Sequence, residues 1–390
     1  MQLRTVLILG GRRIEPLVAA REAGLRVVYL GPRQAISARH LELADTVIGV
    51  DDVDAARALL DGAHAGLGLD AAVPVVDSHV TLAGDVSETL PSPANPASAY
   101  RASHDKARMR TALAGSDLAV SWAGVRTASD ARRAIADVGL PGILKPVDGT
   151  GSNRIHLISQ PQDLPVLPDS PEAGEPEWIY EEFLSGPEYS IETFSADGAH
   201  TVLAVTEKFK SAHFVEVGHL VPARIDAHLA GRIGAAAGRV LSAIGFREGL
   251  AHTEVIVTDA GVRVVETHVR QGGDAIVELV RLATGTDMQR LLFRWLAGHP
   301  VDPAASEHRA AAIWFLTPEP GCVAAVEGEA EAARMPGVTE VVVTVRPGGE
   351  IHEPRSSQGR SGFVIAVGAH ADEALVRARA AAGVITFPRH

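Results

Sequence analysis

The first part of the chain alternates between strand-like and helix-like segments, and this alternation limits the possible folds more than any other feature. Residues 5–9 form an apolar run, residues 16–23 have helical spacing, and residues 25–30 are apolar again. The alternation continues with strand-like segments at 46–50 and 71–76 and a helix-like segment at 53–60. Such a pattern predicts a parallel sheet covered by helices. The glycines in GGRRIEP lack the G-x-G-x-x-G spacing of a dinucleotide site.

Size and composition indicate a folded protein with more than one lobe. The 390 residues exceed what one hydrophobic core usually spans, and 46% hydrophobic with 22% charged residues is ordinary for globular chains. No apolar run approaches the roughly 20 residues of a membrane span, and the segment ending at Leu9 contains Arg4 and is too short for a secretory signal. We therefore expect a cytoplasmic protein without a membrane partner. The single cysteine, Cys322, excludes an internal disulfide and a cysteine-based zinc site.

The charge pattern argues against nucleic acid and draws attention to the lysines. The net charge of −12 comes from 36 basic and 48 acidic residues, so we expect no nucleic-acid partner. Almost all of the basic residues are arginines. A lysine in such a chain suits a position that needs a compact ammonium group, as beside a phosphate. Codon usage explains any single lysine equally well. The lysines of the chain are Lys106, Lys145, Lys208 and Lys210.

Proline-bearing and acidic stretches divide the rest of the chain. The stretch at 90–96 predicts a boundary, after which Ser103 is expected to cap a helix that carries Lys106 in its first turn. A helix pattern at 128–138 and a Pro/Glu/Asp-rich interruption at 160–177 predict a small mobile lid. Beyond it the pattern predicts strands at 179–194, 201–208 and 252–268, helices at 227–243 and 275–284, a strand-rich tail at 310–369 and a closing helix at 373–382.

The segment TEVIVTDAGVRVVETHVRQGGD is the most informative in chemical terms. Asp259, Ala260 and Gly261 are suited to a three-residue hairpin loop, which would place Val257 opposite Arg263 and Glu254 opposite Glu266. Two carboxylates that face each other across a ladder repel unless something neutralises them. A hard divalent cation held by oxygen ligands does so, and the pair therefore predicts a metal site.

The residues that follow this hairpin favour the metal interpretation over a solvated polar face. Alternation by two puts His268 and Arg270 on the same side as Glu266. A surface hairpin also shows polar residues at every second position, so alternation alone decides nothing. The ending RQGGD, however, breaks the strand with two glycines and offers Asp274 as a helix cap, as an organised turn would.

Three other segments carry candidate site residues. In ILKPVDGTGSNRI a strand with Lys145 runs into a glycine-bearing loop whose N–H groups could cradle phosphate, although it is not a Walker A loop and a plain turn is the alternative. In WIYEEFLSGPEYSIETF, Phe183 and Leu184 beside a bend form an apt slot for adenine, with Glu188 near the ribose. In HFVEVGHLVPA, Glu216 and His219 flank Gly218 and suit either a substrate site or a polar loop.

In this order and at these separations, the four segments resemble the ATP-grasp superfamily along nearly the whole chain. Within it, HFVEVGHLVPA and ETHVRQGGD look like the carboxylate-amine ligase branch that includes bacterial L-amino-acid ligases. The resemblance implies an α/β and α+β architecture: an N-terminal βα pre-ATP-grasp domain at 1–102, an ATP-grasp domain at 103–305 with a mobile lid at about 117–180, and a strand-rich C-terminal subdomain at 306–390. A homodimer is common in the family, and the resemblance leaves the oligomeric state open.

The resemblance also implies how ATP and a cation would be held. Mg²⁺, or Mn²⁺ in its place, would be bound by Glu254 and Glu266. His268 stands where the family has an asparagine as third ligand, and imidazole is a softer ligand than magnesium prefers. The implied nucleotide contacts are Lys106 and Lys145 with the phosphates, a mobile loop of Gly149, Thr150, Gly151 and Ser152 over them, Glu181, Glu182, Phe183 and Leu184 at adenine, and Glu188 at the ribose.

The implied reaction joins a small-molecule carboxylate to an amine through an acyl phosphate, with release of ADP and phosphate. Arg270 would stabilise the phosphoryl-transfer transition state and the acyl phosphate. Lys145, His219 and Glu216 would complete the catalytic set, and Trp314 and Asp77 are further candidates for the substrate pocket. Two alternatives remain open: a biotin-carboxylase-like or purine-pathway enzyme of the same fold, and a nucleotide-binding module without turnover.

Overall fold

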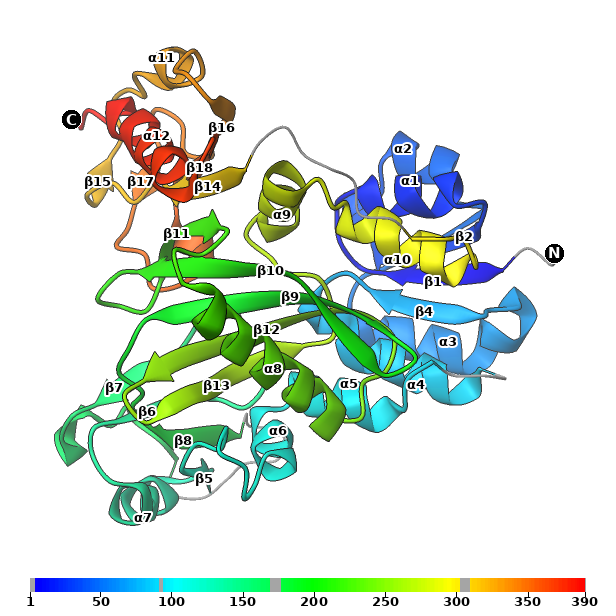
Figure 1. The fold of residues 1–390 in the computed structure, drawn as a ribbon, viewed down its shortest axis with the longest axis horizontal. Coiled ribbons are helices and arrows are strands. Elements are labelled where there is room, and N and C mark those ends of the chain that lie inside the picture. The colour runs from blue at the N-terminus through cyan, green and yellow to red at the C-terminus, as the bar shows by residue number, and fades with distance from the viewer. Residues whose placement is uncertain (1–3, 91–93, 169–176, 302–308, 390) are drawn as a thin grey trace.

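A parallel sheet of the order β3-β2-β1-β4 forms the N-terminal part of the protein, as predicted (Figure 1). The computed structural model describes residues 4–90, 94–168, 177–301 and 309–389. The strands of this sheet are β1 Thr5–Leu9, β2 Arg26–Pro32, β3 Thr46–Val50 and β4 Ala71–Pro74. The helices of this part are α1 Glu15–Glu22, η1 Arg33–Ala35, α2 Ala38–Leu43, α3 Val53–Leu67, η2 Asp77–His79, α4 Val80–Thr89 and α5 Ala97–His104.

A large antiparallel sheet of the order β13-β12-β9-β10-β11-β14-β18-β16 crosses the middle of the molecule (Figure 1). It joins the central part of the chain to the C-terminal part through the pairing of β11 with β14. Its strands are β9 Glu188–Ala196, β10 Ala199–Lys210, β11 Glu216–Val221, β12 Gly249–Thr258, β13 Gly261–His268, β14 Ala310–Phe315, β16 Val338–Val343 and β18 Gly362–Gly368. The helices around it are α8 Ala227–Ala243, α9 Ile276–Thr284, α10 Met288–Leu296, α11 Glu329–Ala332 and α12 Ala371–Val384.

A smaller antiparallel sheet, β5-β8-β6-β7, lies at the far end of the large sheet and carries α7 on one face (Figure 1). The predicted helix at 128–138 is α7 Ala128–Val138, and a capping box formed by Thr127 caps its N-terminus. The remaining elements are α6 Lys106–Ala112, β5 Trp122–Val125, β6 Gly142–Pro146, β7 His156–Ile158, η3 Pro161–Asp163, β8 Trp178–Glu182, β15 Gly321–Cys322, β17 Glu350–Ile351 and η4 Ser357–Gly359.

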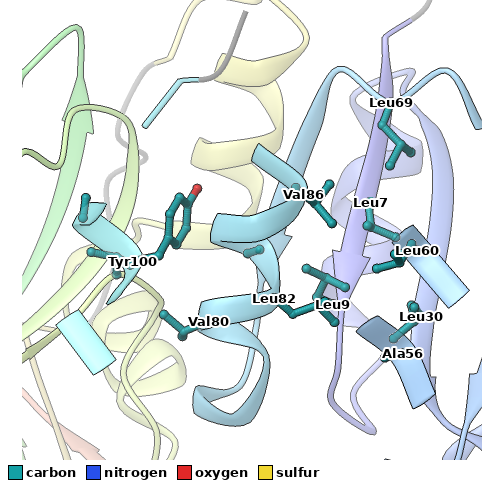
Figure 2. Close-up of a cluster of buried hydrophobic side chains, with 14 of the residues drawn as sticks. Leu7, Leu9, Leu30, Ala56, Leu60, Leu69, Val80, Leu82, Val86 and Tyr100 are labelled. Atoms are coloured by element: carbon teal, nitrogen blue, oxygen red, sulfur yellow. The ribbon is translucent and has the colours of Figure 1, made fainter. Parts of the chain in front are cut away.

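One hydrophobic cluster ties the N-terminal sheet to the rest of the chain. Figure 2 shows Leu7, Leu9 and Leu30 of the sheet on the side of α4 where Leu82 and Val86 lie, with Tyr100 on α5 on the far side of that helix. The same cluster includes residues that flank the large sheet, among them Leu241, Phe246 and Val269. Burying each such side chain favours the folded state by roughly 1.5–3 kcal/mol, so this cluster holds the N-terminal sheet to the segments that flank the large sheet.

The helix pair α5–α6 departs from the sequence prediction. Asp105, with an extended backbone, separates the two helices, and its carboxylate accepts the N–H of Arg108 as the cap of α6. The Ser103 hydroxyl instead donates to the carbonyl of Tyr100 within α5, so the predicted Ser103 cap was wrong. Lys106 does lie in the first turn of α6, as predicted.

The predicted boundaries at 90–96 and 305 fall partly or wholly outside the described residues, as does part of the acidic interruption at 160–177. The division of the chain into domains therefore stays a prediction. No helix in the described part of the chain combines the length and the apolar character needed to cross a membrane.

Candidate active site

All of the lysines of the chain line one cavity of about 770 Å³. The small sheet, the β12–β13 hairpin, the β10–β11 pair and the loop at 357–360 form its walls. Every residue that was predicted to bind the nucleotide, to bind the cation or to act in catalysis lies on the cavity wall, and so does Asp77. Trp314 is not among the described wall residues. The Arg379 guanidinium stacks over its ring instead, with Cζ 4.1 Å from the ring centroid.

The β12–β13 hairpin has a tighter loop than predicted. Thr258 pairs with Gly261, so two residues form the loop, and Arg263 lies opposite Ile256 rather than Val257. The predicted three-residue loop and its register were therefore wrong. The Thr258 hydroxyl donates to the Gly261 carbonyl at 2.9 Å, and Gly261 has a φ of 118°, which a side chain would disfavour.

A β-bulge nevertheless brings Glu254 and Glu266 opposite each other, as predicted. The pairing skips Val265, which adds one residue to β13 and compensates for the shorter loop. The carbonyl of Val265 accepts the Nη2–H of the buried Arg110 at 2.9 Å. The bulge thus sets the register of the acidic pair and is itself held by an arginine.

Cationic side chains surround the Glu254–Glu266 pair. Lys208 Nζ lies 2.5 Å and His252 Nε2 3.0 Å from Glu254 Oε1. Lys106 Nζ lies 3.1 Å from Glu266 Oε2. Burial alone would raise the pKa of the Glu254 carboxyl, but the charge of Lys208 and the hydrogen bond from His252 hold that pKa well below its usual range. Both carboxylates are therefore ionised, and either can act as a ligand only by exchanging some of these contacts for a cation.

His268 is bonded at both ring nitrogens. Its Nδ1 lies 2.9 Å from Asp77 Oδ1 and its Nε2 lies 3.0 Å from Glu266 Oε1. Burial alone would lower the pKa of His268, but the charge of Glu266 and the hydrogen bonds to Asp77 and Glu266 together outweigh it and raise that pKa. Within the described residues, no three His, Cys, Asp or Glu side chains are grouped as a metal site would require. The two N–H bonds leave His268 without a lone pair for a cation in this arrangement.

Asp77 also orients Arg270 at the end of the hairpin. The Nε–H of Arg270 donates to Asp77 Oδ1 at 2.7 Å, and its Nη2 contacts Asp77 Oδ2. A further bond of 2.5 Å runs from Arg270 Nη1 to the carbonyl of Gln271. Because Asp77 follows β4 and Arg270 follows β13, this pair joins the N-terminal sheet to the cavity. The guanidinium is thereby held in one orientation on the cavity wall.

Glu181 is buried and holds two cations. Its Oε1 lies 2.7 Å from Arg110 Nε and its Oε2 lies 2.8 Å from Lys145 Nζ. Burial alone would raise the pKa of Glu181, but the charges of Arg110 and Lys145 lower it to about 2. Both oxygens of the Glu181 carboxylate are bound to Arg110 and Lys145. The Glu181 side chain therefore fixes Lys145, and neither oxygen is turned toward an adenine base.

The predicted adenine and ribose residues share one side of the cavity. Phe183 and Leu184 line it, and the Phe183 ring meets the Phe214 ring edge-on at a centroid distance of 6.5 Å. Glu182 Oε1 accepts the N–H of Ser121 at 2.8 Å. Glu188 Oε1 lies 3.0 Å from Lys208 Nζ. This side is thus an apolar slot with the lysine-bound carboxylate of Glu188 beside it.

The loop after β6 is folded over the cavity. Gly151 and Ser152 have φ values of 64° and 58°, and the Ser152 hydroxyl donates to the carbonyl of Phe214 at 3.0 Å. Lys106 Nζ donates to the carbonyl of Gly149 at 2.6 Å. The loop connects two strands, because β6 pairs with β7 on its far side.

Asp274 does not cap the following helix. The residue before α9 is Ala275, with no side-chain cap, and Asp274 and Ala275 have φ values of 50° and 59°. This left-handed turn leaves the Asp274 carboxylate on the cavity wall, where Arg360 binds it with two bonds of 2.8 and 2.6 Å. His219 Nε2 lies 3.4 Å from the same carboxylate. The predicted cap was wrong because Arg360, distant in sequence, competes for the carboxylate.

Several wall residues were not assigned by the sequence. The scarcity of lysine drew attention to Lys208 and Lys210, but the sequence assigned neither residue a role in the site. His252 precedes Glu254 by two residues, so strand alternation could have indicated it. For Arg360 and Ser357 no local signal exists, because their loop meets the cavity only through the pairing of β14 with β11 and β18.

Family models match two parts of the chain. Residues 138–278 match the ATP-grasp domain, and residues 314–388 match the L-amino acid ligase C-terminal domain 2. The chain belongs to the ATP-grasp superfamily. The second match places it in the carboxylate-amine ligase branch of that superfamily, so the resemblance drawn from the sequence is confirmed.

Known relatives of this ATP-grasp chain are distant. The uncharacterized protein y4rH of Sinorhizobium fredii is 28% identical over 67% of this chain and 56% of its own length. Alanine–anticapsin ligase of Bacillus subtilis is 27% identical over 48% of this chain and 45% of its own length. The chain thus spans about half the length of these curated relatives.

A solved structure confirms the predicted ATP-grasp fold. The L-amino acid ligase from Bacillus licheniformis superimposes with a TM-score of 0.81 at 19% identity, over 100% of both chains. The mixed α/β architecture with a parallel N-terminal sheet and a large antiparallel sheet agrees with the prediction. At this level of identity, the likeness concerns the fold.

Proposed function

We propose that this protein is an ATP-dependent carboxylate-amine ligase acting on amino-acid-like substrates. The observation that carries the proposal is the convergence of all the lysines and the facing Glu254–Glu266 pair on one cavity. A carboxylate is a poor acyl donor because its leaving group would be oxide. Transfer of the γ-phosphoryl group of ATP makes that oxygen part of phosphate, which an amine can then displace, with release of ADP and phosphate.

We propose that the phosphates of ATP lie between Lys106 and Lys145, under the loop from Gly149 to Ser152. The lysine ammonium groups lie on the cavity wall and are held by Glu266 and Glu181. Adenine would occupy the slot beside Phe183 and Leu184. Charge-assisted contacts to phosphate oxygens are the strong hydrogen bonds of such a site.

Glu254 and Glu266 fit a magnesium ion, since both offer ionised carboxylate oxygens that face each other. A bound magnesium ion would screen the phosphate charges during transfer. We assign His268 the task of holding Glu266 by its Nε2–H, because the contact of its Nδ1 with Asp77 leaves no nitrogen for the cation.

We propose that phosphoryl transfer takes place beside Arg270. Asp77 aims this guanidinium, which would stabilise the charge on the transferring phosphoryl group and on the carbonyl oxygen of the acyl phosphate. His219 and Asp274 lie further along the wall, with Arg360. This end of the cavity carries both signs of charge, as a zwitterionic amino acid requires.

The proposal is tested by measuring ADP and phosphate release from purified protein with pairs of amino acids from a broad panel. We expect at least one pair to raise ADP release and to yield an amide in equal amount. Hydroxylamine should intercept the acyl phosphate as a hydroxamate. If ADP release rises only with bicarbonate or formate, the purine-pathway or biotin-carboxylase alternative is favoured, and if ATP binds with no turnover on any substrate, the ligase proposal fails.

A further inference from the structure

A buried imidazole lies directly behind one of the facing carboxylates. His252 Nε2 lies 3.0 Å from Glu254 Oε1, and His252 Nδ1 lies 2.7 Å from Glu192 Oε1. His252 lies on β12 opposite Glu192 on β9, and the Glu192 side chain is fully buried. The imidazole therefore bridges two carboxylates, of which Glu254 lines the cavity and Glu192 does not belong to its described wall.

The neighbouring strand repeats this arrangement. His268 bridges Asp77 and Glu266 with contacts of 2.9 and 3.0 Å. His252 and His268 are directly opposite each other in the β12–β13 ladder, and their rings stack with a centroid distance of 6.1 Å and an angle of 29°. Each carboxylate of the facing pair thus receives a hydrogen bond from its own histidine, and each histidine is backed by a second carboxylate.

The surroundings of Glu192 show that this bridge is tightly packed. A Cβ on Gly272 would lie 3.0 Å from both Glu192 Oε2 and His252 Nδ1, so only glycine fits here without a shift. Glu192 Oε2 is buried without a hydrogen-bond partner among the described residues. Leaving a buried carboxylate oxygen unpaired is costly, and such a group suggests a task other than stability.

We propose that His252 is a positioning residue that, backed by Glu192, holds Glu254 in the orientation in which it binds the nucleotide-bound cation. A free glutamate side chain has three rotatable torsions, and the Nε2–H bond selects one orientation before the cation arrives. The inference rests on the proposed function for the identity of the cation site. It goes beyond it by assigning a role to His252 on the cavity wall and to the buried Glu192 behind it.

Two substitutions at one position separate the two bonds of the imidazole. In His252→Asn the amide nitrogen takes the place of Nδ1, which keeps the bond to Glu192 and loses the one to Glu254. In His252→Gln the amide nitrogen takes the place of Nε2, which keeps the bond to Glu254. His200→Asn is the matched control, because His200 on β10 bonds Ser195 and Ser242 and lines no part of the described cavity wall.

The experiment measures Mn²⁺ binding in the presence of ADP by electron paramagnetic resonance, the Mg²⁺ concentration for half-maximal ADP release, and thermal melting. We expect His252→Asn to weaken Mn²⁺ binding about 10-fold or more, as loss of a partner behind a ligand does. His252→Gln should recover most of that loss, and His200→Asn should bind Mn²⁺ like the unchanged protein.

The inference is overturned if His252→Asn binds Mn²⁺ as tightly as the unchanged protein, or if the Asn and Gln variants lose binding equally and in step with their melting temperatures. The Mn²⁺ measurement needs no turnover. A protein that releases no ADP with any substrate, yet loses Mn²⁺ affinity in His252→Asn alone, would refute the proposed ligase activity and support the positioning role.

Discussion

Ser357 donates its backbone N–H to the carbonyl of Gly151 at 3.0 Å, which joins the C-terminal part of the chain to the loop over the cavity. The Ser357 hydroxyl donates to Glu216 Oε2 at 2.9 Å, and the Ser152 hydroxyl lies 3.4 Å from both oxygens of the same carboxylate. Glu216 thus connects the loop to the C-terminal part, and the closed loop depends on residues that are far apart in sequence.

Ser357→Ala should loosen the loop over the cavity. The substitution removes the hydroxyl bond to Glu216 but keeps the backbone bond to Gly151. A hydrogen bond to a charged group contributes about 1.5–3 kcal/mol, less where water competes, so we expect the KM for ATP to rise about 3- to 10-fold. ATP hydrolysis without an amine should increase, because a looser loop admits water to the acyl phosphate. Steady-state kinetics with and without the amine measure both effects, and unchanged values would show that the contact is incidental.

Glu266→Gln should nearly abolish turnover while the protein stays folded. The amide keeps the shape of the side chain but loses the charge that would hold the cation and that pairs with Lys106 and His268. We expect ADP release to fall about 100-fold or more. Glu207→Gln is the control, since Glu207 pairs with Arg224 and lies outside the described cavity wall. Turnover near normal in Glu266→Gln would contradict the cation site.

Lys145→Ala should raise the ATP concentration needed for half-maximal rate by about 10-fold or more, from the loss of a charged hydrogen bond. Lys145→Arg should not restore the activity, because a planar guanidinium differs in shape and bonding from an ammonium. ADP-release kinetics over a range of ATP concentrations test this. Full activity of the arginine variant would indicate that only the charge at this position matters.

Glu181 should stabilise the fold in a pH-dependent way. Its pKa falls from 4.5 to about 2 in the folded protein, so its contribution is fully present above pH 4.5 and is lost as the pH falls toward 2. Glu181→Gln should therefore be less stable than the unchanged protein at neutral pH, and this difference should shrink between about pH 4.5 and 2. Urea unfolding at several pH values measures the difference, and a gap that stays constant through this range would contradict the assignment.

Local patterns predicted much of the fold. The strand at Thr46–Val50 and the helices Ala128–Val138 and Ala227–Ala243 lie where the spacing of apolar residues indicated them. The facing of Glu254 and Glu266 was also predicted, although the loop was assigned one residue too many and the bulge at Val265 compensated. Such features depend on neighbours in sequence, and a short window contains the information that specifies them.

The sequence by itself determined the parallel N-terminal sheet and the acidic hairpin, because periodicity and turn residues act over a few positions. The order of its four motif segments indicated the superfamily, through their resemblance to that family. Only the tertiary structure decided which charges meet. Asp77 and Arg270 are 193 residues apart and Asp274 and Arg360 are 86 apart, and each pair forms because packed sheets bring distant chain segments together. The partners of these side chains depend on that packing, and no local pattern in the chain encodes them.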